Sequence, residues 1–185
     1  MAVKLSAVAL EIATEAHKGQ TSWDGEPYIE HPKRVASRFD IDTFQDEMLR
    51  AIAYLHDVLE DCEGWTSQKL MRELLRRGIE PQDAGPIVSG VVALTRLEGE
   101  PYVVSIARAA KSPLARQIKE SDLLENTGRL PPKQTQRREK YLFSLAYIRF
   151  AGSLTPAQLV DFERLVQNDP EIAALWKLAE DSPAS

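Results

Sequence analysis

Apolar residues recur every three to four positions along the chain, and this spacing constrains the fold more than any other feature. An α-helix brings residues three and four apart onto one face, whereas a half-buried strand alternates at every second residue. No segment shows the alternating pattern convincingly, so we expect an all-α fold. The helical spacing is clearest in LSAVALEIATEAH (5–17), DEMLRAIAYLHDVLED (46–61), SQKLMRELLRRG (67–78) and AGPIVSGVVALT (84–95).

The second half of the chain continues the helical pattern. Helices are expected through 102–111, 113–126 and 133–150. Gly128 should end the second of them, and the proline at position 131 should break the chain before the third.

Length and composition favour one domain with a tail. A chain of 185 residues with 43% hydrophobic content can bury one sizeable core and hardly more. We expect a domain over 1–150 and a tail over 151–185. The tail begins with a capping Thr155 before Pro156 and should form one or two amphipathic helices that pack on the core or on a partner.

Charge and cysteine usage exclude several partners and compartments. The formal net charge of -5 argues against non-specific nucleic-acid binding, although local basic clusters could hold a small phosphorylated ligand. The single cysteine, Cys62, cannot form an internal disulfide. No signal peptide or membrane-spanning run is seen. We expect a cytoplasmic protein without a membrane partner, and leave homo-oligomerisation open.

The segment LHDVLED (55–61) places a histidine and three carboxylates inside an apolar helix. Burying such groups without partners costs several kcal/mol each, so a compensating partner is expected. On a helical wheel, Ile52, Leu55 and Leu59 share one arc. The opposite arc holds the polar groups around a small residue that leaves room for a hydrated cation: Ala53, His56, Asp57, Glu60 and Asp61.

Two ligands are too few for a cation, and the chain has three histidines, at positions 17, 31 and 56. His31 lies close to the start of an expected helix, where a ligand would be held rigidly. Asp122 is flanked by leucines in KESDLLEN (119–126). His31, His56, Asp57 and Asp122 would form a mixed nitrogen and oxygen site, which suits manganese better than structural zinc.

Five sequence blocks together resemble a known family. They resemble the HD-domain hydrolases of the RelA/SpoT group, and specifically the free-standing small alarmone hydrolases. The resemblance covers the chain from His17 to Asn126 and does not extend to the tail. The blocks are AHKGQ (16–20), GEPYIEHP (25–32), LHDVLED (55–61), VVALT (91–95) and KESDLLEN (119–126).

The resemblance implies an HD domain of metal-dependent phosphohydrolase type over 1–150. It implies release of pyrophosphate from the 3′ position of guanosine tetra- or pentaphosphate, leaving GDP or GTP. Glu60 and Asp61 match the catalytic acidic pair of the family. They lie one turn beyond two of the ligands, where they could orient or deprotonate the attacking water. One Mn²⁺ would be bound, through His31, His56, Asp57 and Asp122.

Substrate contacts are predicted for residues outside the metal set. Asn126 matches a nucleotide-contacting position of the family. Lys18, Lys119 and Arg129 are candidates for neutralising the diphosphate. Tyr102 follows a glycine-containing loop, begun by Arg96, that could close over a nucleotide.

One departure from the family pattern concerns the recognition of the nucleotide base. Many members carry an arginine that packs on guanine where this chain has Ser22. Guanine preference is therefore open, and the adjacent Trp23 could supply a stacking surface instead. A metal-dependent hydrolase of another nucleotide, such as NADPH, is the first alternative, and a catalytically silent regulatory module is the second. Because no synthetase segment follows, a bifunctional enzyme is not expected.

Most of these residues also have a structural interpretation. His17 is expected to pack and hydrogen-bond near the end of the first helix. His56 and Asp57 could be a buried hydrogen-bonded pair, His31 a helix cap and Asp122 a solvated helix residue. Asn126 could end its helix, and Trp23 could pack on the domain.

Overall fold

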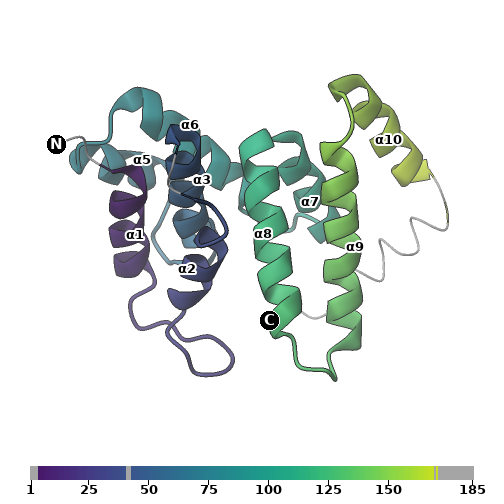
Figure 1. Ribbon diagram of the computed structural model, residues 1–185, viewed down its shortest axis with the longest axis horizontal. Helices are drawn as coiled ribbons and strands as arrows, with labels where there is room; N and C mark the ends of the chain where they lie inside the picture. The colour runs from purple at the N-terminus through teal and green to yellow at the C-terminus, as the bar shows by residue number, and fades with distance from the viewer. Residues whose placement is uncertain (1–3, 41–42, 169, 171–185) are drawn as a thin grey trace. The chain divides into compact units, whose positions relative to one another are not determined.

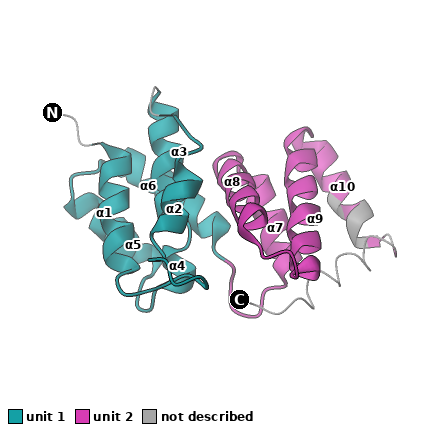
Figure 2. Ribbon diagram, turned by 60° about the horizontal axis from the view of Figure 1, so that its bottom comes forward, with its two compact units in different colours: residues 1–95 teal, residues 96–185 magenta. Residues whose placement is uncertain are grey.

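The computed structural model describes residues 4–40, 43–168 and 170. These residues form ten α-helices and no strand, apart from an isolated bridge between Thr21 and Pro27 (Figure 1). The prediction of an all-α fold is confirmed. The chain divides into two compact units, unit 1 over Met1–Thr95 and unit 2 over Arg96–Ser185 (Figure 2). A separate domain over 1–150 with a tail over 151–185 stays a prediction.

Unit 1 is built around the third helix, α3. A capping box between Thr43 and Asp46 satisfies amide groups at its start. Its apolar face is fully buried against α1, α2 and α6, with Ile52 and Leu55 at 0% exposure. The helices of unit 1 are α1 (Leu5–Ala16), α2 (Glu30–Ala36), α3 (Phe44–Leu55), α4 (Val58–Asp61), α5 (Ser67–Arg76) and α6 (Pro81–Leu94).

A glycine allows α3 and α6 to approach closely. A Cβ atom added to Gly90 of α6 would lie 2.7 Å from Cδ1 of Ile52, closer than real Cβ contacts. Gly85, one and a half turns earlier on the same helix, has nothing within 4 Å of its Cβ position. Of these two glycines, Gly90 is therefore the one whose missing side chain allows the close contact between α3 and α6.

The helix predicted over residues 46–61 is interrupted, so the prediction of one continuous helix was wrong. α3 ends at Leu55, His56 and Asp57 form a turn, and the short helix α4 begins at Val58. Asp57 is the N-cap residue of α4, and its carbonyl accepts from the amide of Asp61 at 2.8 Å. The wheel of a single helix consequently does not describe how the polar side chains of this segment are directed.

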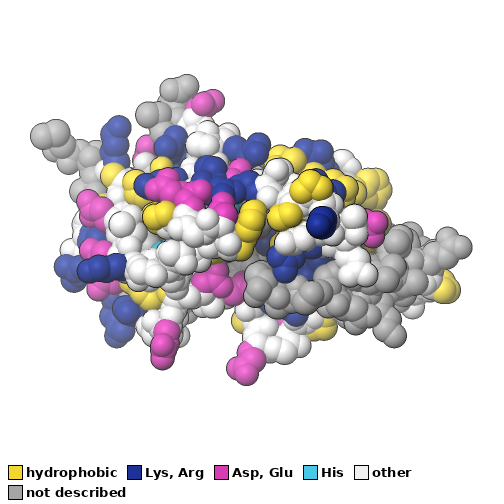
Figure 3. Space-filling view, turned by 90° about the horizontal axis from the view of Figure 1, so that it is seen from below, with side chains coloured by type: hydrophobic (Ala, Val, Ile, Leu, Met, Phe, Trp, Pro, Cys, Tyr) yellow, Lys and Arg dark blue, Asp and Glu magenta, His cyan; other side chains and the backbone are white. Residues whose placement is uncertain are grey.

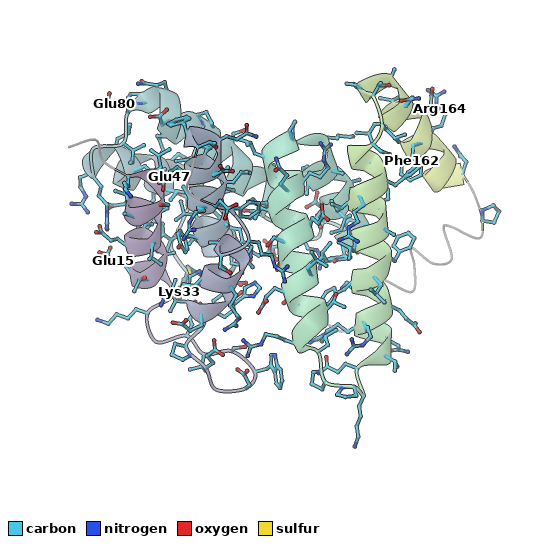
Figure 4. All side chains as sticks on the ribbon, viewed as in Figure 1. Glu15, Lys33, Glu47, Glu80, Phe162 and Arg164 are labelled. Carbon is cyan, nitrogen blue, oxygen red and sulfur yellow. The ribbon has the colours of Figure 1, made fainter. Side chains whose placement is uncertain are left out.

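Unit 2 consists of three mutually packed helices and a fourth that adds to them. Its core includes the fully buried Ile118 and Ile148. Phe162 of the fourth helix is directed at the third (Figure 4), with its ring 5.2 Å from that of Tyr147 and 4.9 Å from that of Phe150. The helices are α7 (Tyr102–Lys111), α8 (Pro113–Arg129), α9 (Thr135–Gly152) and α10 (Pro156–Asn168).

One helix boundary agrees with its predicted cap and another differs from the prediction. Thr155 accepts from the amide of Gln158 at 3.3 Å, as expected, and Thr66 caps α5 in the same way by accepting from the amide of Lys69 at 3.2 Å. Gly128 does not end its helix, since α8 continues to Arg129 and stops before the proline that follows. The part of the expected tail helices beyond residue 170 lies outside the described residues.

The surface carries charges of both signs. On the face drawn in Figure 3, acidic and basic side chains are interspersed. Among the described residues, no helix combines the length and the apolar character needed to cross a membrane.

Candidate functional site

Two histidines and an aspartate meet in unit 1, where the start of α2 faces the turn between α3 and α4. Oδ2 of Asp57 lies 3.1 Å from Nε2 of His56 and 3.6 Å from Nε2 of His31. Ligand atoms of the two histidines lie within 4.8 Å of each other. The side chains are 3%, 12% and 19% exposed for His56, His31 and Asp57. The structure thus brings three predicted metal ligands together.

The orientation of His56 leaves its Nε2 facing the other site residues. Nδ1 of His56 lies 2.7 Å from the carbonyl oxygen of Ala53. A carbonyl can only accept, so Nδ1 carries a proton and donates it. Nε2 faces the Asp57 carboxylate at 3.1 Å and can donate an electron pair to a cation placed between the two. This donor geometry fits a divalent cation.

Tyr28 connects Asp57 to the predicted catalytic carboxylate of Asp61. Its hydroxyl lies 2.7 Å from Oδ2 of Asp57 and 2.9 Å from Oδ2 of Asp61. Burial and the two carboxylates raise the pKa of Tyr28 far above its ordinary range. Burial of the carboxyl group and the adjacent Asp57 raise the pKa of Asp61, although the hydrogen bond from Tyr28 opposes this. A raised pKa suits a carboxylate that must accept a proton.

Glu60, the other predicted catalytic residue, is exposed on α4. Its backbone amide donates to the carbonyl of Asp57 at 3.2 Å. The one-turn helix therefore ties Glu60 to the same turn that carries the ligands.

His17 has the structural role expected for it. It is 3% exposed at the end of α1, and its ring stacks 4.8 Å from that of Tyr28. Gln20 donates through Nε2 to the carbonyl of Asp61 at 2.8 Å, so its Oε1 accepts from Nδ1 of His17 at 2.7 Å. Burial raises the pKa of the neighbouring Cys62 thiol to about 11, which keeps the thiol protonated and inert at neutral pH.

The loop between α1 and α2 carries the residues predicted to contact the base and the diphosphate. Trp23 is 67% exposed, and Lys18 is exposed as well. Ser22 is half-buried and bonded through its amide to the carbonyl of Glu26 at 2.8 Å. Trp23 is therefore mostly exposed, and its role in binding stays a prediction.

Asp122 lies in α8 of unit 2 and is 4% exposed, so it is not a solvated helix residue. Lys119 donates to its Oδ2 at 2.9 Å and Asn126 to its Oδ1 at 2.6 Å. Both partners come from the same helix, one turn before and one turn after. Asn126 lies inside α8 and does not end it. Three predicted site residues therefore form one partly buried polar cluster around Asp122, and Asp122 as a metal ligand stays a prediction.

A cationic cluster in unit 2 contains residues to which the sequence pattern gave no role. Lys140 of α9 lies 3.9 Å from the ring centroid of Tyr102. Burial, followed by the nearby charges of Arg96, Arg137 and Lys119, lowers the pKa of Lys140 to about 8. The fold thus holds several cations near Lys140, and such a cluster is suited to an anion. We call Arg96, Lys119, Arg137 and Lys140 the cationic cluster.

Tyr102 forms part of the framework of this cluster. Its hydroxyl accepts from Ser144 at 3.2 Å, and burial raises its pKa. The preceding loop is fixed by Glu100, which pairs with Arg108 at 2.7 Å and accepts from the amide of Leu97 at 3.0 Å. Lys119 was predicted to contact the diphosphate, and Arg96 to begin the loop before Tyr102. Arg137 and Lys140 lie in a basic run at 133–140, a pattern that more often marks a solvated face.

Comparison with known proteins points to one group. No family model matches the chain. It is 33% identical over 139 residues to a probable GTP pyrophosphokinase of Mycobacterium leprae, covering 71% of this chain and 17% of that protein. It is 31% identical over 132 residues to the guanosine-3′,5′-bis(diphosphate) 3′-pyrophosphohydrolase of Aquifex aeolicus, covering 71% and 18%. The chain spans less than a fifth of the length of these relatives.

A shorter segment of 57 residues is 47% identical to the enzyme of the same name from Vibrio cholerae, covering 28% of this chain and 7% of that one. A solved structure, described as a metazoan ortholog of SpoT that hydrolyses ppGpp, matches with a TM-score of 0.64 and 20% identity. That match covers 92% of this chain and 98% of the other. The helical fold is therefore shared along nearly the whole length of both chains.

Proposed function

We propose that this chain, a member of the RelA/SpoT group of HD-domain hydrolases, hydrolyses guanosine tetra- or pentaphosphate to GDP or GTP and pyrophosphate. The observation that carries the proposal is the meeting of His31 and His56 at one oxygen of Asp57. Two relatives of the chain are named for the same reaction.

The metal we propose is Mn²⁺, and the ligands we propose are those of the sequence prediction, His31, His56, Asp57 and Asp122. Imidazole nitrogen combined with carboxylate oxygen is a donor set that accepts manganese readily. When bound, the ion supplies Lewis-acid activation of water and neutralises phosphate charge. The hydrogen bond from His56 to the Ala53 carbonyl fixes the ring so that Nε2 is available as a donor.

Asp61 and Glu60 would move the protons of the reaction. Water attacks the phosphorus next to the 3′ oxygen, the bond between that phosphorus and the 3′ oxygen breaks, and the oxygen takes up a proton. The raised pKa of Asp61 suits it to accept the proton of the water. Glu60 is exposed on the same short helix and can exchange protons with solvent.

The cationic cluster would hold the phosphates of the nucleotide. A diphosphate brings several negative charges, and charge-assisted hydrogen bonds from lysine and arginine are the strong ones. Lys140 and Arg137 extend the set that Lys18, Lys119 and Arg129 were predicted to form. Asn126 and Tyr102 would line the same region of unit 2.

One observation on the residues predicted to contact the base favours a second substrate. Ser22 offers no guanidinium, and the 67% exposed Trp23 offers a ring that stacks on any base. Another phosphorylated nucleotide, such as NADPH, is therefore the alternative substrate of the same site.

Product analysis tests the proposal. Protein purified without chelator is incubated with guanosine tetraphosphate and Mn²⁺, and the products are separated by ion-exchange chromatography. We expect GDP and pyrophosphate in equal amounts, loss of both after EDTA dialysis, and recovery when Mn²⁺ is returned. Cleavage of NADPH but not of guanosine tetraphosphate would overturn the proposed identity of the substrate.

A double variant separates an enzyme from a silent regulatory module. Glu60→Gln with Asp61→Asn should lower kcat by about 10²- to 10⁴-fold, the usual contribution of general acid–base catalysis, while the metal content stays at the wild-type level. Equal turnover by wild type and variant would remove these residues from the mechanism.

A further inference from the structure

The hydroxyl of Tyr28 lies between two carboxylates with different proposed tasks. It is 2.7 Å from Oδ2 of Asp57 and 2.9 Å from Oδ2 of Asp61. The oxygen that it touches on Asp57 is the same atom that faces His31 and His56. One phenol group therefore contacts both the metal-binding and the proton-handling side of the site.

Several contacts hold Tyr28 in this position. Its amide donates to the carbonyl of Gln20 at 3.0 Å. Its ring lies 4.8 Å from the ring of His17 and meets the ring of His31 edge-on at 5.9 Å. The ring is packed from two sides, so the hydroxyl has little freedom to turn away.

A phenol has one proton and can donate to one carboxylate at a time. The two acceptor oxygens near Tyr28 must therefore share that proton, which couples the position of Asp61 to that of Asp57. The main chain of Asp61 is held separately, because Gln20 donates to its carbonyl. Tyr28 thus contacts the side chain of Asp61, and Gln20 holds its backbone.

We propose that Tyr28 is a positioning residue that sets the separation of the ligand Asp57 from the proton acceptor Asp61. The proposal rests on the proposed function. Its hydrogen bond orients the oxygen of Asp57 toward the two histidines, so metal affinity depends on it. Its second contact, with Oδ2 of Asp61, keeps that carboxylate beside the water that the site activates, so turnover depends on the hydroxyl too.

Tyr28→Phe tests this with a readout that needs no turnover. The change keeps the ring and removes the hydroxyl. We expect the Kd for Mn²⁺, measured by electron paramagnetic resonance, to rise by about 10- to 100-fold, as for other residues that orient metal ligands. At saturating Mn²⁺, kcat should still fall and KM should stay unchanged. A wild-type Kd together with a wild-type kcat would overturn the proposal.

Tyr54→Phe is the matched control. Tyr54 is a buried tyrosine of α3 in the same unit, and its hydroxyl accepts from Arg50 at 3.2 Å. We expect Tyr54→Phe to leave both the Kd for Mn²⁺ and kcat unchanged. An equal loss in both variants would mean that any buried hydroxyl matters, which would contradict a positioning role for Tyr28.

A double variant of Tyr28 and Asp61 distinguishes a positioning role of Tyr28 from a packing role. If Tyr28 acts on turnover through Asp61, adding Tyr28→Phe to Asp61→Asn should lower kcat at saturating Mn²⁺ no further than Asp61→Asn alone. Additive losses would contradict the proposal. A wild-type protein that binds Mn²⁺ but cleaves no guanosine tetraphosphate would refute the proposed function, and the Kd comparison would still decide whether Tyr28 positions Asp57.

Discussion

The two units carry polar clusters of opposite character. In unit 1, imidazole and carboxylate groups meet at a turn that interrupts a helix, and Asp57 is held by Tyr28. In unit 2, lysine and arginine side chains come together from regular helices and the loop before them, and Lys140 lies over the ring of Tyr102. We propose that the difference separates two tasks, because electron-pair donors suit a metal and water, whereas cations suit the charge of the phosphates.

The largest effect should follow from removing a ligand in unit 1. His56→Ala deletes the oriented Nε2 donor, so we expect the variant to lose its metal and its turnover. Binding of guanosine tetraphosphate, measured by calorimetry, should weaken much less, because the cationic cluster is intact. A His56→Ala protein that keeps its metal and its activity would contradict the separation of tasks.

Removing a cation in unit 2 should produce the complementary result. Lys140→Ala deletes a charge-assisted contact of about 1.5–3 kcal/mol, which corresponds to a rise in KM of about 10- to 100-fold. Metal content and kcat should stay at wild-type values. The control is Lys133→Ala, since Lys133 is exposed in the segment before α9. A fall in metal content with Lys140→Ala would contradict the proposed separation of tasks between the two units.

The pH dependence of KM should sharpen the same contrast. Lys140 has its pKa lowered to about 8, so it is a cation below that pH and loses its charge above it. KM of the wild type should therefore rise severalfold between pH 7 and 9.5, because the free enzyme loses this charge within that range. The KM of Lys140→Ala should lack this rise. A wild-type KM that is flat over the range would exclude Lys140 from substrate binding.

The smallest effect on activity should come from the helix contact that supports the unit 1 site. Gly90→Ala places a methyl group 2.7 Å from Cδ1 of Ile52. We expect the free energy of unfolding to fall by about 1–3 kcal/mol, with kcat almost unchanged. Gly85→Ala, in open space on the same helix, should be neutral or stabilising. Thermal unfolding of the two variants measures the difference, and equal stability would contradict the close approach.

Local features of the sequence predicted most of the fold and much less of the candidate site. Helical spacing and the threonine caps depend on neighbours in the chain, and the caps at Thr66 and Thr155 are present. The convergence of His31 with His56 and Asp57 was predicted chiefly through the resemblance to a family. It follows physically from α2 packing on α3.

Other features depend on contacts between distant parts of the chain. The break at Asp57 had one local signal, because Asp57 and Glu60 have the spacing of an N-cap and its partner. The Asp57 side chain makes no capping bond and instead accepts from Tyr28, 29 residues away in the sequence. The cations of unit 2 are likewise spread from position 96 to position 140, so no local pattern indicates that they meet.

Anomalous diffraction from a crystal grown with Mn²⁺ tests the central claim most directly. We predict one strong peak at the manganese edge, at bonding distance from Nε2 of His31, Nε2 of His56 and a carboxylate oxygen of Asp57. A fully active protein whose crystals show no peak at these three side chains would contradict it.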